Sequence, residues 1–378
     1  MATWVAVAHE DDAAKNFYAE LLEDEAGAQL AGQVVAAAQA ARLLGPYGVY
    51  PEPELAGESQ PGPWSRHRAE VFGEHLAGAL DLAHLMVFHP RDSRPEAWAA
   101  LAAAGWTTSA AVSLAQLISF LTFQLRVVAG LRALTGNGVT AAPALAEEVA
   151  CNHGRRVRAA DARGPVDADL RGTAALPIDP LAQLVAPQRF VAHQLGWRAW
   201  LQPVAKAELT AAQRESLIKP ERADNPYFRL LARDPAALKA RTLTDLDIFY
   251  NTDGGLGRAA REFAATVTSR LNGCVYCASV HAGRTLSEEP GRSTEIDQLL
   301  ARGAQQPVGE PIFDAVRGLA VALTATPPEV DSSHIEALLR AGLDEVAVVD
   351  AINSVAFFNW ANRLMLGLGR PELPRRYR

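Results

Sequence analysis

Residues 261–281 read REFAATVTSRLNGCVYCASVH and predict two consecutive helices. Asn272-Gly273 is a typical helix end, because glycine readily adopts the left-handed conformation of a C-cap. A second helix should begin at or near Cys274, which places Cys274 and Cys277 in its first turn. In the other long segments, apolar residues recur at spacings of three and four, and strand-like alternation is scarce. The sequence therefore predicts an all-α fold.

An internal repeat is the largest feature of the chain. Residues 104–131 align without a gap with residues 341–368, at an offset of 237 residues. The identical pairs are Ala104/Ala341, Gly105/Gly342, Ala110/Ala347, Val112/Val349, Phe120/Phe357, Arg126/Arg363, Gly130/Gly367 and Leu131/Leu368. Matched Gly, Phe and Arg residues are hard to obtain by chance between helices rich in Ala and Leu. We therefore expect a duplicated helical fold, with Arg126 and Arg363 in structural roles.

The domain boundaries follow from the segment between the two copies. It is rich in Gly, Pro and charged residues and has little periodicity, which is typical of a linker. We expect a first domain at 1–145, a linker at 146–181 and a second domain at 182–378. Cys151 falls in this linker and is expected to be an incidental thiol.

Composition restricts the functional classes. The net charge is −7 over 378 residues, so no overall positive field would hold nucleic acid or an anionic membrane. Three cysteines are too few for a disulfide framework, and a signal peptide is not expected, which together favour the cytoplasm. The most apolar stretch, 110–131, contains Gln116, Gln124 and Arg126 and indicates a buried helix rather than a membrane span.

The cysteine pair carries the expected chemistry. The first turn of a helix stabilises a thiolate, so we expect a lowered thiol pKa there and an exposed Cys274 open to reductants. His281 follows Cys277 by one helical turn on the same face, where it can accept a thiol proton. This spacing favours Cys277 as the thiol that attacks. Glu262 lies on the preceding helix and can orient His281 if the two helices pack together.

Two alternatives remain open for these residues. The cysteines could be buried packing residues, because free cysteine is among the most buried residue types. Alternatively, Cys274, Cys277 and His281 supply three zinc ligands, but the sequence nearby offers no clear fourth ligand. We expect neither a metal nor a bound cofactor.

The spacing Glu-x11-Cys-x-x-Cys-x-x-x-His, filled by Glu262, Cys274, Cys277 and His281, resembles the core motif of AhpD-like alkylhydroperoxidases in the carboxymuconolactone decarboxylase superfamily. Three further stretches are similar to the peroxidase-related branch: 225–228, 241–245 and 358–363. Residues 104–131 resemble the closing helices of the same fold, so the first domain looks like a degenerate copy without a cysteine pair. Where the best-known members carry a second histidine, this chain has Tyr276, which we expect to cover the pocket.

The resemblance implies an AhpD-like helical bundle, duplicated in one chain, that reduces hydroperoxides through a Cys274–Cys277 disulfide. It implies an external dithiol as reductant, such as a lipoyl or thioredoxin-like protein, and a homotrimer of fused chains or another homo-oligomer. Three other functions stay open: a protein dithiol-disulfide oxidoreductase or redox sensor, a lyase like the superfamily's namesake, and a non-catalytic assembly protein.

Overall fold

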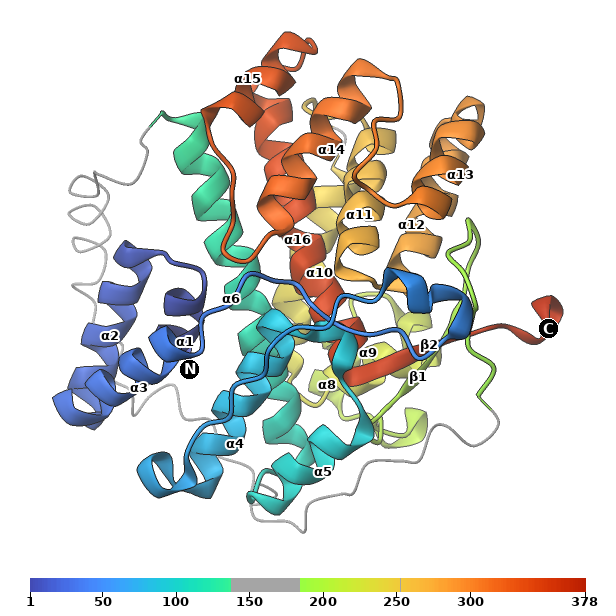
Figure 1. The fold of residues 1–378 in the computed structure, drawn as a ribbon. Coiled ribbons are helices and arrows are strands. Elements are labelled where there is room, and N and C mark those ends of the chain that lie inside the picture. The colour runs from blue at the N-terminus through green and yellow to red at the C-terminus, as the bar shows by residue number, and fades with distance from the viewer. Residues whose placement is uncertain (137–183, 252) are drawn as a thin grey trace.

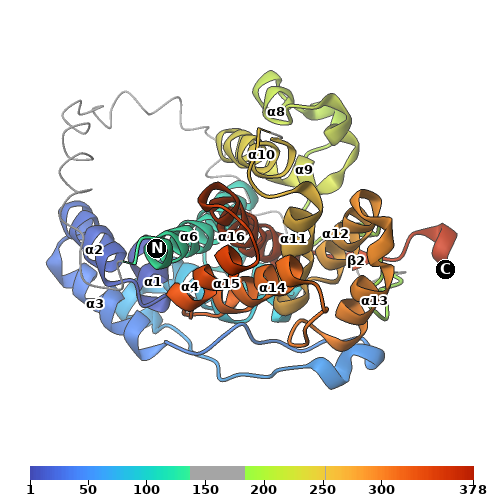
Figure 2. The ribbon, with the colours of Figure 1, turned by 90° about the horizontal axis from the view of Figure 1, so that it is seen from above.

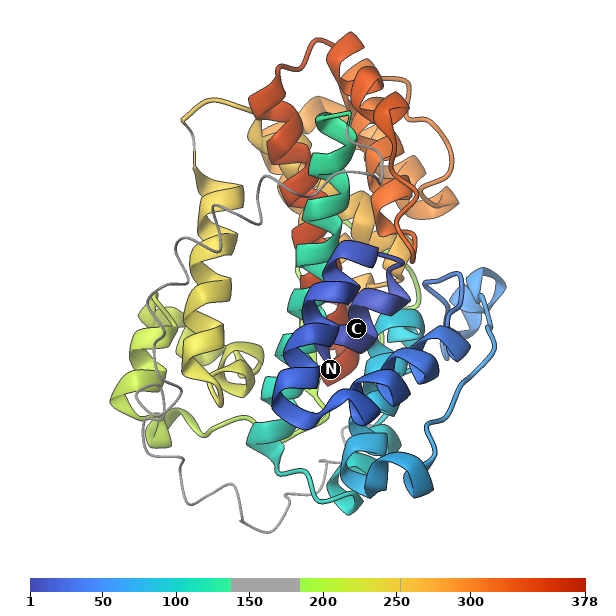
Figure 3. The same ribbon diagram turned by 90° about the vertical axis from the view of Figure 1, so that its left-hand side faces the viewer.

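Two long helices form the centre of the molecule. A computed structural model describes residues 1–136, 184–251 and 253–378. Helices α6 (Thr108–Leu134) and α16 (Glu345–Leu368) lie side by side in both Figure 1 and Figure 3. The other helices are α1 (Ala2–Ala8), α2 (Asp12–Ala26), α3 (Ala28–Ala40), α4 (Ala69–Phe88), α5 (Pro95–Ala103), α8 (Ala211–Ser216), α9 (Pro226–Leu231), α10 (Pro235–Tyr250), α11 (Arg258–Asn272), α12 (Val275–Glu288), α13 (Ser293–Arg302), α14 (Pro311–Thr324) and α15 (Ser332–Arg340).

The all-α prediction is confirmed, with one small addition. Strand β2 (Gly369–Glu372) follows α16 directly and pairs antiparallel with strand β1 (Gly196–Ala199). This pair could not be predicted from the sequence, because glycine and Pro371 are poor strand residues. Among the described residues these two strands form the only sheet.

The two central helices make matching contacts at the 237-residue offset. Thr107 caps α6 by accepting from the N–H of Ala110, and Asp344 caps α16 by accepting from the N–H of Ala347. The Arg126 guanidinium donates to the carbonyl of Thr324, and the Arg363 guanidinium donates to the carbonyl of Val87 at the matching position. The structural role expected for both arginines is therefore observed. The same contacts support the duplication, which itself stays a prediction.

The two halves of the chain share one buried apolar cluster. It contains Trp4 and Phe88 from the first half, and Trp360 and Leu368 from the second. Figure 2 shows α1 to α4 on one side of the central pair, where α1 and α4 contact α6, with α8 to α10 on the other side. The linker predicted at 146–181, and Cys151 within it, lie outside the described residues. The domain boundaries therefore stay predictions.

Two of the described helices, α4 and α6, are long and apolar enough to cross a membrane by length and composition. The structure buries 56% and 61% of their most apolar windows inside the fold. The core helices of water-soluble proteins show similar burial. The apolar stretch 110–131 lies within α6, and most of its side chains are buried, as predicted from the sequence.

Candidate active site

The sharp turn between α11 and α12 places the cysteine pair. Gly273 ends α11 in the left-handed conformation, with φ 74° and ψ 22°. A Cβ at this position would lie 2.1 Å from Cδ of Arg91 and 2.6 Å from the hydroxyl of Tyr50, so only glycine fits. Cys274 is the N-cap residue of α12, and Cys277 follows in its first turn, as the sequence predicts.

Both thiols are buried, which corrects two expectations. Cys274 is 2% exposed and Cys277 is 4% exposed, so Cys274 is not the exposed thiol that its place at a helix end suggested. Burial, and then the neighbouring Cys277 thiol, raise the pKa of Cys274 well above its ordinary value. The backbone N–H groups at the start of α12 act in the opposite direction and are outweighed. Cys274 therefore rests as a neutral thiol.

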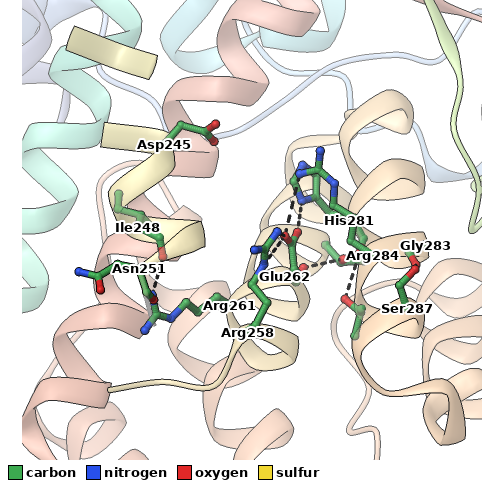
Figure 4. A network of polar contacts seen from close by, with 12 residues as sticks. Asp245, Ile248, Asn251, Arg258, Arg261, Glu262, His281, Gly283, Arg284 and Ser287 are labelled. Carbon is green, nitrogen blue, oxygen red and sulfur yellow. Dashed lines mark hydrogen bonds and ion pairs between the residues drawn. The ribbon is translucent and has the colours of Figure 1, made fainter. Parts of the chain in front are cut away.

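Glu262 and His281 form a buried hydrogen-bonded pair next to this turn. The carboxylate of Glu262, fully buried on α11, accepts a hydrogen bond from Nδ1 of His281 on α12. A second oxygen of Glu262 accepts from Arg258, one turn earlier, and lies 3.9 Å from Arg284. Figure 4 shows Glu262 in the middle of these three side chains, while Asp245 stands apart from them.

The charges in this cluster define the protonation states. Burial alone would raise the pKa of Glu262, but His281, Arg284 and Arg258 outweigh it and lower that pKa to about 2. Burial lowers the pKa of His281, although Glu262 partly opposes this. At neutral pH the carboxylate is ionised and can only accept, so Nδ1 of His281 carries the proton. Its Nε2 therefore bears a lone pair that can take another proton.

Two aromatic rings lie close to His281. The ring of Phe358 on α16 meets it edge-on, with centroids 4.3 Å apart, and Phe249 on α10 lies 6.2 Å away. Within the described chain no hydrogen bond joins His281 to either thiol. Any proton transfer to His281 from Cys277, one turn earlier on α12, would therefore need a small movement or a bridging molecule.

A small cavity reaches one of the two thiols. It has a volume of about 50 Å³ and is lined by Cys274, Gly273 and Tyr276, together with residues of both halves. Tyr276 thus borders the pocket, and its hydroxyl accepts a hydrogen bond from Gln194. Burial raises the pKa of Tyr276 to about 12, so the hydroxyl stays protonated. Where the chain is described, no group of three or more His, Cys, Asp or Glu could hold a metal ion.

Comparisons with known proteins bear on the same segment. Residues 235–317 match the model of the carboxymuconolactone decarboxylase family. These residues belong to the carboxymuconolactone decarboxylase superfamily. The chain is also similar to a solved structure described as an alkylhydroperoxidase AhpD core, an uncharacterized peroxidase-related protein from Ralstonia eutropha JMP134. The identity is 24%, the match covers 46% of this chain and 90% of that one, and the TM-score is 0.38. No curated protein matches significantly.

The superfamily segment contains the whole candidate relay. Glu262, Cys274, Cys277 and His281 all lie within residues 235–317. The arginines that hold Glu262 were not predicted from the sequence, although the four-residue spacing from Arg258 to Glu262 is typical of an ion pair on a helix. Nor were the contributions of the first half to the cavity at Cys274. Those depend on long-range packing and leave no local pattern.

Proposed function

We propose that the protein is a thiol-dependent peroxidase that reduces hydroperoxides through Cys274 and Cys277, with His281 and Glu262 as a proton relay. The observation that carries this proposal is the buried Glu262–His281 pair beside two buried thiols on one helix turn. A neutral imidazole held by a carboxylate is a general base, and a neutral thiol needs one.

Cys277 is assigned as the attacking thiol because His281 follows it by one helical turn. Nε2 of His281 takes the thiol proton, and Glu262 stabilises the imidazolium that forms. The sulfur of Cys277 then attacks the peroxide, the O–O bond breaks, and the alcohol leaves with the proton from His281. Cys277 becomes a sulfenic acid. Cys274 condenses with it, releases water and forms the disulfide, which an external dithiol such as a lipoyl or thioredoxin-like protein reduces.

Burial separates this function from the alternatives. A folded protein is too large to reach thiols that are 2% and 4% exposed, which disfavours general protein disulfide exchange. Among the external reductants, the same burial favours a small dithiol such as a lipoyl group over a thioredoxin-like protein. A lyase like the superfamily's namesake needs the acid–base pair but no thiols. Lyase activity should therefore survive the loss of either cysteine, whereas the proposed peroxidase activity should not. The proposed homotrimer of fused chains is tested by molecular mass in solution.

Mild peroxide should convert the two thiols into an intramolecular disulfide. Intact-mass analysis of protein treated with an equimolar hydroperoxide should show the loss of two hydrogen atoms, and peptide mapping should join Cys274 to Cys277. Cys274→Ser should instead accumulate the sulfenic acid of Cys277 and its higher oxides, because the resolving thiol is absent. Unchanged mass in the wild type, or only singly oxidised cysteines, would contradict the proposal.

A further inference from the structure

The cavity at Cys274 is positively charged, although the chain as a whole carries −7. Three arginines line it: Arg91 and Arg94 from the first half, and Arg370 from β2. Among the described residues, Glu52 is the only acidic one in its wall. The cavity wall therefore carries a formal excess of two positive charges next to a thiol.

Only one of these arginines is neutralised by a carboxylate. The Arg370 guanidinium forms an ion pair with Glu52. Arg94 donates to the carbonyls of Arg91 and Ser93, at 2.8 and 2.7 Å, and forms no ion pair with an acidic side chain of the described chain. Burial, and next the charge of Arg370, lower the pKa of Arg94, while Asp92, Glu52 and Glu96 partly oppose this.

Arg91 is placed directly beside the reactive turn. It is 8% exposed, its guanidinium lies 5.1 Å from the ring centroid of Tyr50, and its side-chain carbons pack on Gly273. Its hydrogen bonds to the carbonyls of Glu58 and Pro46 are both long at 3.5 Å. No carboxylate of the described chain pairs with it.

Two buried donors of the cavity wall lack an acceptor from the described protein. They are Nε of Arg91 and Nε1 of Trp200, whose residue is 1% exposed. Buried N–H groups are normally paired, so these two donors can serve an acceptor that binds at the cavity. The positive charge and the orphaned donors both suit an anion.

We propose that this cavity binds the carboxylate of a small acidic thiol, which reduces the Cys274–Cys277 disulfide by attacking Cys274. This inference rests on the proposed function. A volume of about 50 Å³ accommodates a carboxylate and a few further atoms, so a short-chain acid fits inside the cavity. Cys274 lines the cavity and Cys277 does not, so the ligand meets the resolving cysteine.

Two thiol–disulfide exchange steps reduce the Cys274–Cys277 disulfide. The reductant thiol releases its proton, which neutral His281 takes up, and the resulting thiolate forms a bond to the sulfur of Cys274. The Cys274–Cys277 bond breaks, and Cys277 leaves as a thiolate that takes this proton from His281. A second reductant thiol attacks the mixed disulfide and frees Cys274. Two reductant thiols lose two electrons and become a disulfide, and their two protons end on Cys274 and Cys277.

Alkylation of the reduced protein tests the cavity without any peroxide. In a Cys277→Ser background, we compare the rates at which iodoacetate and iodoacetamide label Cys274, since the two reagents differ mainly in charge. Glu52→Gln adds one positive charge to the wall and should raise the iodoacetate/iodoacetamide rate ratio about threefold or more, while Arg94→Met should lower it by a similar factor. Arg94→Lys should restore the ratio, and added salt should reduce it.

Arg340→Met is the matched control, because Arg340 is exposed at the end of α15 and its loss changes the net charge by the same amount. It should leave the ratio unchanged. An equal ratio in the wild type, Glu52→Gln and Arg94→Met would overturn the anion site, as would failure of iodoacetate to label Cys274. Neither result depends on peroxidase activity, so the proposed function would stand or fall separately.

The same variants test the reductant directly. Reduction of the preformed disulfide by 3-mercaptopropionate relative to 2-mercaptoethanol should rise in Glu52→Gln and fall in Arg94→Met, each about threefold relative to the wild type. If the alkylation ratios respond to charge but the reduction ratios do not, the cavity binds anions and the acidic-thiol assignment is wrong.

Discussion

Replacing Glu262 with Gln lowers the second-order rate constant for hydroperoxide reduction about 100-fold or more in our account. The carboxylate holds the proton on Nδ1 of His281 and stabilises the imidazolium that forms during attack. The neutral amide of glutamine can donate as well as accept a hydrogen bond, so it does not hold the proton on Nδ1. Without a negative charge it also does not stabilise the imidazolium. Stopped-flow oxidation of the reduced enzyme, followed by the change in tryptophan fluorescence or by thiol loss, measures this constant.

The pH profile distinguishes this role from a structural one. The rate requires neutral His281, so it is retained above the pKa of His281 and lost as the pH falls through it. Burial sets this pKa below its ordinary value, and Glu262 partly raises it again. Without the Glu262 charge the pKa of His281 falls further, so the acid limb of the profile should move to lower pH.

Glu288→Gln is the control for the Glu262 variant, because it makes the same chemical change at an exposed position near the end of α12. It should keep the wild-type rate and profile. A Glu262→Gln enzyme that folds normally and keeps both the rate and the acid limb of the wild type would remove Glu262 from the relay.

Arg126→Met should destabilise the protein by about 3–5 kcal/mol, because it leaves several buried acceptors without a donor. Arg126 is fully buried on α6, and burial holds its pKa well below the usual value. Its guanidinium bridges α6 to the end of α14 in the other half of the chain. The groups it contacts are Leu323 O, Thr324 O, Ala325 O, Thr326 Oγ1, Thr122 O and His9 Nε2.

Urea unfolding measures the loss of stability in Arg126→Met and also shows whether the two halves of the chain unfold together. The wild type should unfold in a single transition, since both halves contribute to one buried cluster. Arg340→Met, at an exposed site, should change the free energy of unfolding by about 0.5 kcal/mol or less. An Arg126→Met protein as stable as the wild type, or a first half that melts in its own transition, would contradict this picture.

The sequence predicted the local features of the site because they depend on local signals. Asn272-Gly273 marks a helix end through backbone conformation alone, and the structure has that end at that position. The spacing from Cys277 to His281 places both on one face of any helix. The structure also brings Glu262 and His281 together, which the sequence expected only if α11 and α12 pack side by side.

The ionisation of the thiols could not be predicted in the same way. A helix start lowers a thiol pKa when water can reach it, and that expectation failed here because Cys274 is buried. The cover comes in part from Tyr50 and Arg91, which are more than 180 residues away along the chain. The wall of the cavity and its charge are likewise set by packing between the two halves, which no motif records.

Hydroperoxide consumption in the presence of excess dihydrolipoamide tests the central claim most directly. The wild type is compared with Cys274→Ser and Cys277→Ser, and with Arg340→Met as a variant remote from the site. We expect multiple turnovers in the wild type and the control, and loss of turnover in both cysteine variants. A wild type that is fully reduced and metal-free yet consumes no hydroperoxide, or a cysteine variant that keeps the wild-type rate, would contradict a two-cysteine peroxidase.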